Sequence, residues 1–378
     1  MLKILKYFFF LKNVIFKFKK LHKREIIIFD SSNVDSLKEI IPKDKYFVLP
    51  VRPSEIKEIY LSFKLIIFLI ENIFKRSPKQ NYLNFIIQQV DPKTVVTAVE
   101  TSADFYFSAD YFKETKIKFV AIQHSCLRGA GFVNDENLNK IIYIPNFLCF
   151  SEYEKKLFKN TKAKIKRYLP VGSLRASLFI RRLKNKNLNI IKKVYDICLI
   201  GEPSSRTTND LKNISDYYEI PGKVAEYTLR VCKKNNLKLI FSGKNQTFNN
   251  SHLEEKQYYK YFLKDYDYTI VPKENSFSTF ENAFKSELII GHNSTFLREI
   301  SALHKKVLSL NFLGHDEFKE PFSGITYLEK FSFEEFEKRV LELIKLNQDE
   351  YRKKFVNSPE FISITAADTI ENIKKEIL

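Results

Sequence analysis

The stretch that decides the fold is residues 286–312, SELIIGHNSTFLREISALHKKVLSLNF. Residues 288–290 form an apolar run that is too short for a helix and ends at Gly291. The small polar turn 292–295 contains residues suited to a helix N-cap, and apolar residues then recur at helical spacing from Phe296 to Leu303. Residues 307–310 begin another strand. This order of strand, turn, helix and strand predicts a parallel α/β sheet.

The turn at residues 291–295 is the first candidate ligand site. In an open parallel sheet, ligands bind beyond the carboxyl ends of the strands. The hydroxyls of Ser294 and Thr295 and the N–H groups of the helix start would suit a phosphate there. Glu299 lies one turn further along the same helix face, where its carboxylate can accept hydrogen bonds from a ribose diol. The alternative is an ordinary βαβ unit whose helix is merely capped.

A longer run around this stretch resembles a known family. It consists of Ser278-Thr279-Phe280-Glu281, the strand 288–290, Ser294-Thr295, Glu299 and Lys305-Lys306-Val307-Leu308. This run is similar to the donor half of GT-B glycosyltransferases, and in particular to bacterial surface-carbohydrate and O-antigen biosynthesis proteins. Leu303-His304 stands where that family usually has a glycine before the lysine. The resemblance implies an α/β fold of two Rossmann-like domains, whose parallel sheets face each other across a cleft.

Composition supports a two-domain globular chain and argues against several other classes. The 378 residues are 44% apolar, enough for two cores. The net charge of +18 suggests a polyanion partner, but the lysines are mixed with acids beyond the N-terminus and no nucleic-acid motif is present. We therefore expect no nucleic-acid partner. The four cysteines form no C-x-x-C pair, which fits a reducing, cytoplasmic location.

The N-terminal segment, residues 1–24, has eight Lys/Arg and no acid. An apolar stripe runs through it at helical spacing from Ile4 to Phe18, but no apolar run is long enough to span a membrane. A helix lying on the anionic inner membrane surface is the preferred interpretation, which makes the protein peripheral there. A first domain helix packed on the core is the alternative. Residues 55–74 predict one long helix, whose apolar centre at 65–70 we expect to be buried.

Polar residues follow four predicted strands of the first domain, residues 25–183. The strands at 94–99, 118–122, 146–150 and 167–171 lead into Glu100, His124, Ser151 and Ser173. The carboxyl ends of parallel strands share one rim, so Glu100 and His124 should meet there as candidates for the base that takes a proton from an acceptor hydroxyl. Their structural alternatives are a helix N-cap partner for Glu100 and a core histidine bonded to a carbonyl for His124.

The same family resemblance extends into this domain. The family carries a Glu at one strand end and Gln-His-Gly at the next, matched here by Glu100 and Gln123-His124-Ser125, with Ser125 in place of the glycine. Val171-Gly172-Ser173-Leu174-Arg175 resembles the family's Gly-Ser-x-Arg run. The resemblance thus implies catalytic roles for Glu100 and His124, and acceptor or cleft contacts for Gln123, Ser173 and Arg175.

A basic, Asn-rich link at residues 181–193 precedes the second domain, residues 194–365. Its first strand, 195–200, runs into Gly201-Glu202-Pro203-Ser204-Ser205, a loop of the kind that binds phosphate. Lys244, after the next strand, can neutralise a donor phosphate, although in so lysine-rich a chain its position there by chance is the stronger explanation. The last helix, 366–378, is expected to cross back to the first domain, as is common in GT-B proteins.

No metal or cofactor site is expected. Asp265-Tyr266-Asp267 resembles the metal motif of GT-A transferases, but it precedes a strand rather than ending one, so we interpret it as a solvated turn. No His/Cys cluster has zinc-ligand spacing.

These observations together predict a metal-independent glycosyltransferase. Its nucleotide-sugar donor would lie on Gly201, Glu202, Ser204, Ser205, Lys244, His292, Ser294, Thr295 and Glu299. Its acceptor would be a surface polysaccharide or lipid-linked glycan. One alternative is a CMP- or CDP-linked donor, as in Kdo, sialic-acid or glycerophosphate transfer, where His292 would suit the CMP phosphate. Another is a non-catalytic scaffold docked on the membrane.

Overall fold

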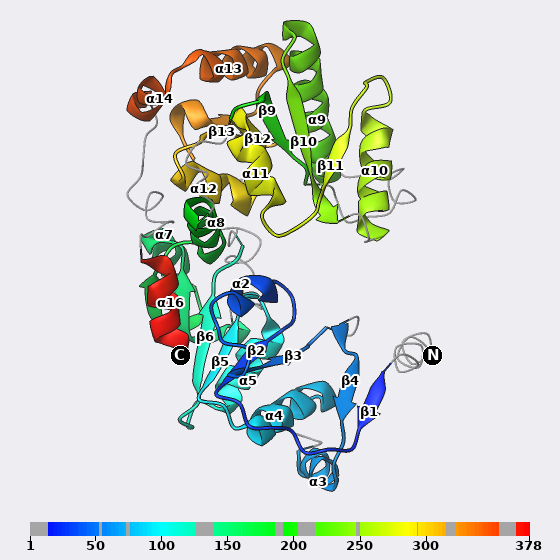
Figure 1. The fold of residues 1–378 in the computed structure, drawn as a ribbon, viewed down its shortest axis with the longest axis vertical. Coiled ribbons are helices and arrows are strands. Elements are labelled where there is room, and N and C mark those ends of the chain that lie inside the picture. Colours follow the sequence, from blue (N-terminus) through cyan, green and yellow to red (C-terminus); the bar gives the residue numbers. More distant parts are fainter. Residues whose placement is uncertain are drawn as a thin grey trace. The chain divides into compact units, whose positions relative to one another are not determined.

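The structure, a computed structural model, describes residues 14–52, 55–72, 76–125, 140–159, 161–185, 192–202, 216–246, 250–292, 294–314, 322–354 and 368–378. These residues form two compact units (Figure 1). Of the described residues, unit 1 holds those up to Ser125, those from 140 to Leu174 and the C-terminal helix. Unit 2 holds those from Arg175 to 354. The division falls at Leu174, before the predicted link at 181–193, because residues 174–185 continue as a helix.

The described part of unit 1 contains the following elements: β1 (Ile15–Lys17), β2 (Ile26–Phe29), α2 (Val34–Lys38), β3 (Tyr46–Leu49), β4 (Glu58–Tyr60), α3 (Phe63–Glu71), α4 (Pro78–Val90), β5 (Thr94–Thr97), α5 (Ala103–Tyr111), β6 (Lys118–Ile122), β7 (Tyr143–Cys149), α7 (Glu152–Phe158), β8 (Lys164–Pro170) and α16 (Thr369–Ile377).

Six of these strands form one sheet in the order β3-β2-β5-β6-β7-β8, and every neighbouring pair is parallel. All residues of β2 and β5 are buried, as expected of strands with both faces covered. The predicted parallel α/β organisation is therefore confirmed for this unit. Because all strands point the same way, the residues that follow β2, β5, β6 and β7 lie along one edge of the sheet.

Two predictions for unit 1 are wrong. The helical stripe predicted through Phe18 does not hold, because β1 pairs in parallel with β4 in a separate two-stranded sheet; the earlier part of that stripe, residues 1–13, lies outside the described residues. The single helix predicted for 55–74 is instead β4 followed by α3, whose N-cap Ser62 accepts a hydrogen bond from Leu65 N–H. Within the apolar centre of that helix only Leu65 is buried, and Ile66, Ile67 and Ile70 are exposed.

The C-terminal helix α16, red in Figure 1, packs on unit 1. Its buried face consists of Thr369, Ile373 and Ile377. Glu376 accepts hydrogen bonds from Lys118 Nζ of β6 at 2.6 Å and from Arg167 Nη2 of β8 at 2.9 Å. The last helix thus joins two strands of the unit that the chain left about 190 residues earlier.

The described part of unit 2 contains the following elements: α8 (Leu174–Asn185, whose first residue belongs to unit 1), β9 (Tyr195–Ile200), α9 (Asp216–Asn235), β10 (Leu239–Gln246), α10 (Asn250–Phe262), β11 (Ile270–Lys273), α11 (Ser278–Phe284), β12 (Ser286–Gly291), α12 (Thr295–Ala302), β13 (Lys306–Asn311), the 3₁₀ turn η5 (Gly324–Thr326), β14 (Tyr327–Glu329), α13 (Phe333–Lys345) and α14 (Gln348–Lys354).

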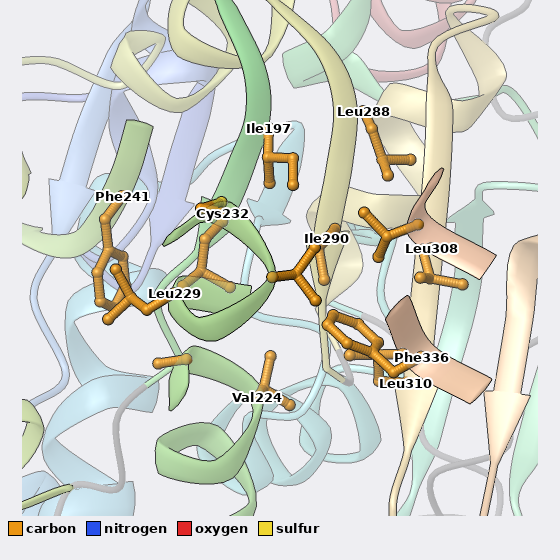
Figure 2. Close-up of a cluster of buried hydrophobic side chains, with 14 of the residues drawn as sticks. Ile197, Val224, Leu229, Cys232, Phe241, Leu288, Ile290, Leu308, Leu310 and Phe336 are labelled. Atoms are coloured by element: carbon orange, nitrogen blue, oxygen red, sulfur yellow. The ribbon is translucent and has the colours of Figure 1, made fainter. Parts of the chain in front are cut away.

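The sheet of unit 2 is also wholly parallel, in the order β11-β10-β9-β12-β13-β14. Numbered along the chain, this order is 3-2-1-4-5-6, which is that of the dinucleotide-binding Rossmann fold. Figure 2 shows the core on one face, where Ile197 of β9, Ile290 of β12 and Leu308 of β13 lie near Val224 of α9 and Phe336 of α13. The strand–turn–helix–strand prediction for residues 286–312 is confirmed as β12, α12 and β13.

Candidate functional site

The sheet order of unit 2 indicates where its ligand site should lie. The crossovers change direction between β9 and β12, which are neighbours in the sheet although β10 and β11 separate them in the chain. In open α/β sheets, ligands bind beyond the carboxyl ends of the strands at such a switch point. The residues that follow β9 and β12 are Gly201-Glu202 and His292 to Thr295, which are the two segments predicted to bind the donor.

Glu202 connects three strand ends at this edge. Its Oε1 accepts a hydrogen bond from Ser294 Oγ at 2.8 Å, and its Oε2 lies 2.7 Å from Lys244 Nζ. Its backbone N–H donates to the Tyr259 hydroxyl at 3.1 Å. Ser294 is the N-cap residue of α12, but its hydroxyl makes no capping bond. The structure thus brings together Glu202, Lys244 and Ser294, three residues that the sequence assigned to the donor.

Lys244 lies inside β10 rather than after it as predicted, and a buried carboxylate holds this last part of the strand. Glu255 of α10 accepts hydrogen bonds from the N–H groups of Lys244, at 2.8 Å, and Asn245, at 3.2 Å. Gly201 N–H donates to the Ser242 carbonyl at 2.8 Å. A Cβ atom at Gly201 would lie 3.0 Å from Glu255 Oε1 and 3.1 Å from that carbonyl, so only glycine fits without displacing them.

Glu299 is not open to solvent but pairs with Arg175. The guanidinium lies against the carboxylate in a bidentate arrangement, with Nε 3.3 Å from Oε1 and Nη2 in contact with Oε2. Glu299 is 1% exposed, and the Arg175 guanidinium also lies 5.6 Å from the centre of the Phe280 ring. Arg175, predicted to contact the acceptor, therefore lies beside a residue predicted to contact the donor.

Lys273, at the end of β11, was not among the predicted site residues. Burial lowers the pKa of its ammonium group, and the nearby Arg175 lowers it further. Lys244, Glu202 and Glu299 are also close enough to influence its charge. The sequence signal was present, because Lys273 follows an apolar run just as Lys244 does. One edge of the sheet thus carries three cationic side chains, of Arg175, Lys244 and Lys273.

The other predicted donor residues differ in their surroundings. His292 is buried, and its Nδ1 lies 2.7 Å from the Leu310 carbonyl of β13. Thr295 is the first residue of α12 and is partly buried. Ser204 and Ser205 lie outside the described residues, so the structure does not place them.

In unit 1, Glu100 and His124 are brought together as predicted from their strand ends. Glu100 Oε2 accepts a hydrogen bond from His124 backbone N–H at 3.2 Å, and Oε1 accepts one from Ser125 N–H at 2.8 Å and another from the Ser125 hydroxyl. Glu100 is 2% exposed, whereas His124 is partly exposed. Burial raises the pKa of the Glu100 carboxyl, and the bonds from Ser125 offset part of that rise. Glu100 therefore holds the turn that presents His124.

Gln123 and Ser173 are buried in the same unit. The Gln123 side chain donates to the Ser125 carbonyl at 2.9 Å and to Glu154 Oε1 at 3.1 Å, and accepts from Phe150 N–H at 2.7 Å. Glu154 in turn forms the capping box of α7 with Ser151. Gln123 thus ties the turn that carries His124 to Phe150, at the end of β7, and to Glu154 of α7.

A polar group that the sequence did not single out follows β2 on the same edge. Glu55 accepts hydrogen bonds from the Ser31 hydroxyl at 2.5 Å and the Ser32 hydroxyl at 2.7 Å. Asp30 accepts from Ser32 N–H at 2.9 Å and lies 3.4 Å from Arg52 Nε. β2 neighbours β5, so this group and Glu100 follow adjacent strands.

A cavity of about 750 Å³ opens at the opposite edge of the unit 2 sheet. Its lining includes Tyr195, Leu239 and Thr269, at or just before the amino ends of β9, β10 and β11. Asp267, from the predicted solvated turn, also lines it and is exposed. The volume of this cavity does not make it the ligand site, because the switch-point residues lie at the other ends of these strands.

The described residues offer neither a metal-binding cluster nor a membrane-spanning helix. No group of three or more His, Cys, Asp or Glu residues there is arranged to hold a metal ion. No helix in the described ranges has both the length and the hydropathy needed to cross a bilayer.

Comparisons with known proteins give a family match over part of the chain and a shared fold. Residues 149–321 match the family model described as "putative O-antigen biosynthesis protein". The structure is similar to UDP-GlcNAc 2-epimerase of Methanocaldococcus jannaschii, crystallised with UDP-GlcNAc and UDP, at 13% identity and a TM-score of 0.57, covering 93% of this chain and 98% of the other. It is similar to the enzyme of Rickettsia bellii at 13% identity and a TM-score of 0.58, covering 94% and 96%.

A third similar structure is the wall teichoic acid polymerase TagF, at 12% identity and a TM-score of 0.49, covering 94% of this chain and 89% of the other. None of the curated proteins compared with the chain matches it.

The matched range contains the whole of residues 278–312 and the Val171–Arg175 run, but not Glu100 or His124. The predicted resemblance is thereby confirmed for its second half, and the predicted α/β class is confirmed as GT-B-like. The chain thus has a GT-B-like fold, and its residues 149–321 are similar to the family described as "putative O-antigen biosynthesis protein".

Proposed function

We propose that this chain is a glycosyltransferase that moves a sugar from a nucleotide-sugar donor to a surface polysaccharide or lipid-linked glycan, without a metal ion. The family description supports a role in O-antigen biosynthesis, and the fold is shared with a protein crystallised with UDP-GlcNAc and UDP. We further propose that the transferase acts in the cytoplasm at the inner membrane, where lipid-linked acceptors are accessible.

The observation that carries this proposal is the polar cluster at the switch point of unit 2. The N–H groups at the start of α12 offer donors for a phosphate, which the Ser294 hydroxyl would join on leaving Glu202. Lys244 and Lys273 supply positive charge within the same edge of the sheet. As the bond between the sugar and the diphosphate breaks, the leaving group gains negative charge, which fixed cations stabilise. This is the work that a metal ion does in other transferases, so the cluster supports a metal-independent mechanism.

Unit 1 would supply the acceptor side of the reaction. We assign the imidazole of His124 as the base that takes the acceptor hydroxyl proton while that oxygen forms its bond to the sugar. Glu100 acts through His124 as a positioning residue, because both of its oxygens bind the turn that carries the imidazole. Such a base is needed if the anomeric configuration is inverted; a retaining reaction does not require one.

Nucleotide binding tests the proposal directly. In a thermal-shift and calorimetry panel of UDP, GDP, CDP and CMP, we expect one class to raise the melting temperature of the full chain. Lys273→Met should weaken binding of that nucleotide by roughly ten- to a hundredfold, the loss of one charged hydrogen bond. Lys285→Met, at the exposed C-cap position of α11, is the matched control and should bind normally.

Failure of all four nucleotides to bind would instead favour the non-catalytic scaffold. Preference for CMP or CDP would favour the Kdo, sialic-acid or glycerophosphate class of donor. The metal-independent mechanism is tested with EDTA. Sugar transfer that continues in EDTA would support it, and transfer that is lost in EDTA and restored by Mg²⁺ would contradict it.

A second candidate activity is epimerisation of a nucleotide sugar. The similar structures with TM-scores above 0.5 that we report are UDP-GlcNAc 2-epimerases, matched over nearly their whole length. Incubation with UDP-GlcNAc in the absence of any acceptor distinguishes the two activities. Appearance of the C2 epimer by NMR would support an epimerase. A donor that stays unchanged without acceptor and is consumed once acceptor is added would support the transferase.

A further inference from the structure

Helix α3 turns its apolar stripe outward. Phe63, Ile66, Ile67 and Ile70 recur at the spacing of one helix face and are 76%, 55%, 43% and 66% exposed. In a surface helix of a soluble protein, this stripe normally faces the core. Here the core side of α3 is made by Leu65, which is buried, and by Phe68, whose ring lies 5.7 Å from that of Phe85 in α4. The exposed stripe is therefore additional to the packing that holds the helix.

Strand β1 places further exposed apolar side chains near the start of α3. Ile15, Phe16 and Phe18 are 59%, 45% and 80% exposed. β1 pairs with β4, and Leu61 N–H donates to the Lys17 carbonyl at 2.9 Å, so the end of β1 lies where the chain enters α3. We call the seven side chains the docking face: Ile15, Phe16, Phe18, Phe63, Ile66, Ile67 and Ile70. A monomeric protein rarely leaves so many large apolar side chains exposed in one region unless they bind something.

The charges around the docking face favour one kind of partner. Lys19 and Lys20 follow Phe18 directly and are exposed, as is Lys64 within α3. The described segment from Val14 to Arg24 contains no acidic residue. Lysine beside aromatic and aliphatic side chains is the pattern of segments that lie in the interface of an anionic membrane. The nine residues of α3 are far too few to cross a bilayer, which also fits a helix lying in the membrane plane.

We propose that the docking face inserts into the boundary between headgroups and acyl chains of an anionic lipid bilayer, with Lys19, Lys20 and Lys64 at the headgroups. This contact would hold unit 1 at the surface where a lipid-linked glycan is found. The inference rests on the inner-membrane location in the proposed function and deepens it by naming the residues that make the contact. Its failure can be told from failure of the transferase proposal, because membrane binding and nucleotide binding are measured separately and involve different units.

Vesicle co-sedimentation of the full chain tests this proposal. We expect binding to vesicles of phosphatidylcholine mixed with phosphatidylglycerol and little binding to phosphatidylcholine alone, with the difference reduced by added salt. The variant Ile66→Gln/Ile67→Gln/Ile70→Gln should bind the anionic vesicles at least about tenfold more weakly, because it has three fewer apolar side chains to transfer from water into the bilayer. Nucleotide affinity and the urea midpoint should stay unchanged, because these side chains are exposed in the folded protein.

A matched control removes exposed apolar surface elsewhere. Leu253→Gln/Tyr261→Gln on α10 of unit 2 changes side chains that are 59% and 56% exposed, and it should bind vesicles like the unaltered protein. Equal vesicle binding by the triple variant and the unaltered protein would overturn the proposal. So would a triple variant that loses only self-association in light scattering, which would make the face a contact between copies. A third contrary result is loss of binding on deletion of residues 1–13 but not in the triple variant.

Discussion

At the scale of single residues, two buried carboxylates show how differently the same group can be used. Glu299 is paired with the guanidinium of Arg175, so a ribose diol can reach this carboxylate only if Arg175 moves or shares it. Glu100 has no cation against it in the described structure and instead accepts hydrogen bonds from the His124 turn. Removing either carboxylate should therefore displace the group that it holds, Arg175 or the His124 turn. Any effect on sugar transfer would follow from that displacement.

The prediction at this scale concerns His124. His124→Ala should lower the turnover number for sugar transfer by about 10²- to 10⁴-fold, the usual contribution of a general base, with a smaller change in KM. Glu100→Ala should lower it as well, and Glu100→Gln should recover part of that loss because the amide oxygen still accepts from Ser125. His22→Ala, at an exposed position, is the control. Near-normal turnover in His124→Ala would show that the base is misassigned.

At the scale of elements, the packing of α9 on α10 depends on one glycine. Gly222 N–H donates to the Tyr258 hydroxyl of α10 at 3.1 Å, and a Cβ atom at this position would lie 2.4 Å from Cγ of Phe262. Gly222 follows Pro221 inside α9, so the helix tolerates two poor helix formers at the point of contact. The gain is close approach of the two helices.

Gly222→Ala should therefore lower the free energy of unfolding by about 1–3 kcal/mol, the cost of overpacking a well-packed contact. The change would appear in urea unfolding followed by circular dichroism as a lower midpoint with an unchanged slope. Lys223→Ala, at the next and exposed position, should cost at most a few tenths of a kcal/mol. A stabilised Gly222→Ala protein would mean that helix propensity outweighs the contact with Phe262.

Elements also show what sequence patterns can and cannot predict. The alternation of short apolar runs and helices predicted both parallel sheets, because Gly291 and similar residues mark where each strand ends. The periodicity around Ile66 identified an apolar helix but not the direction in which its stripe points, since that depends on which neighbours cover it. Likewise, nothing local to Ile15 indicates a strand, because its partner β4 lies 43 residues further along the chain.

At the scale of the whole molecule, distance along the chain limited the prediction of the site. Glu100 and His124 were expected to meet because they follow strands that are close in sequence. Arg175 and Glu299 are 124 residues apart, and no spacing rule connects them. The sequence showed that residues such as Lys273 follow strands. It did not show which strands are neighbours, so the strand ends that lie together are known only from the order of the sheet.

The prediction at this scale concerns α16. Ile373→Ala should destabilise unit 1 by about 2–5 kcal/mol, because this side chain is fully buried. Hydrogen exchange should then show faster exchange at the amides of β7 and β8, with those of β9 and β12 unchanged. Lys375→Ala, exposed on the same helix, is the control. Equal loss of protection in both units would mean that they unfold as a single cooperative block.

The return of α16 to unit 1 also has a consequence for biosynthesis. Unit 1 contains residues on both sides of unit 2 in the chain, so its final helix is made only after all of residues 175–365. At a translation rate of about 5–20 residues per second, this interval is on the order of 10–40 s. During this interval the strands of unit 1 lack their final helix. We therefore expect chaperones to bind this half of the nascent chain.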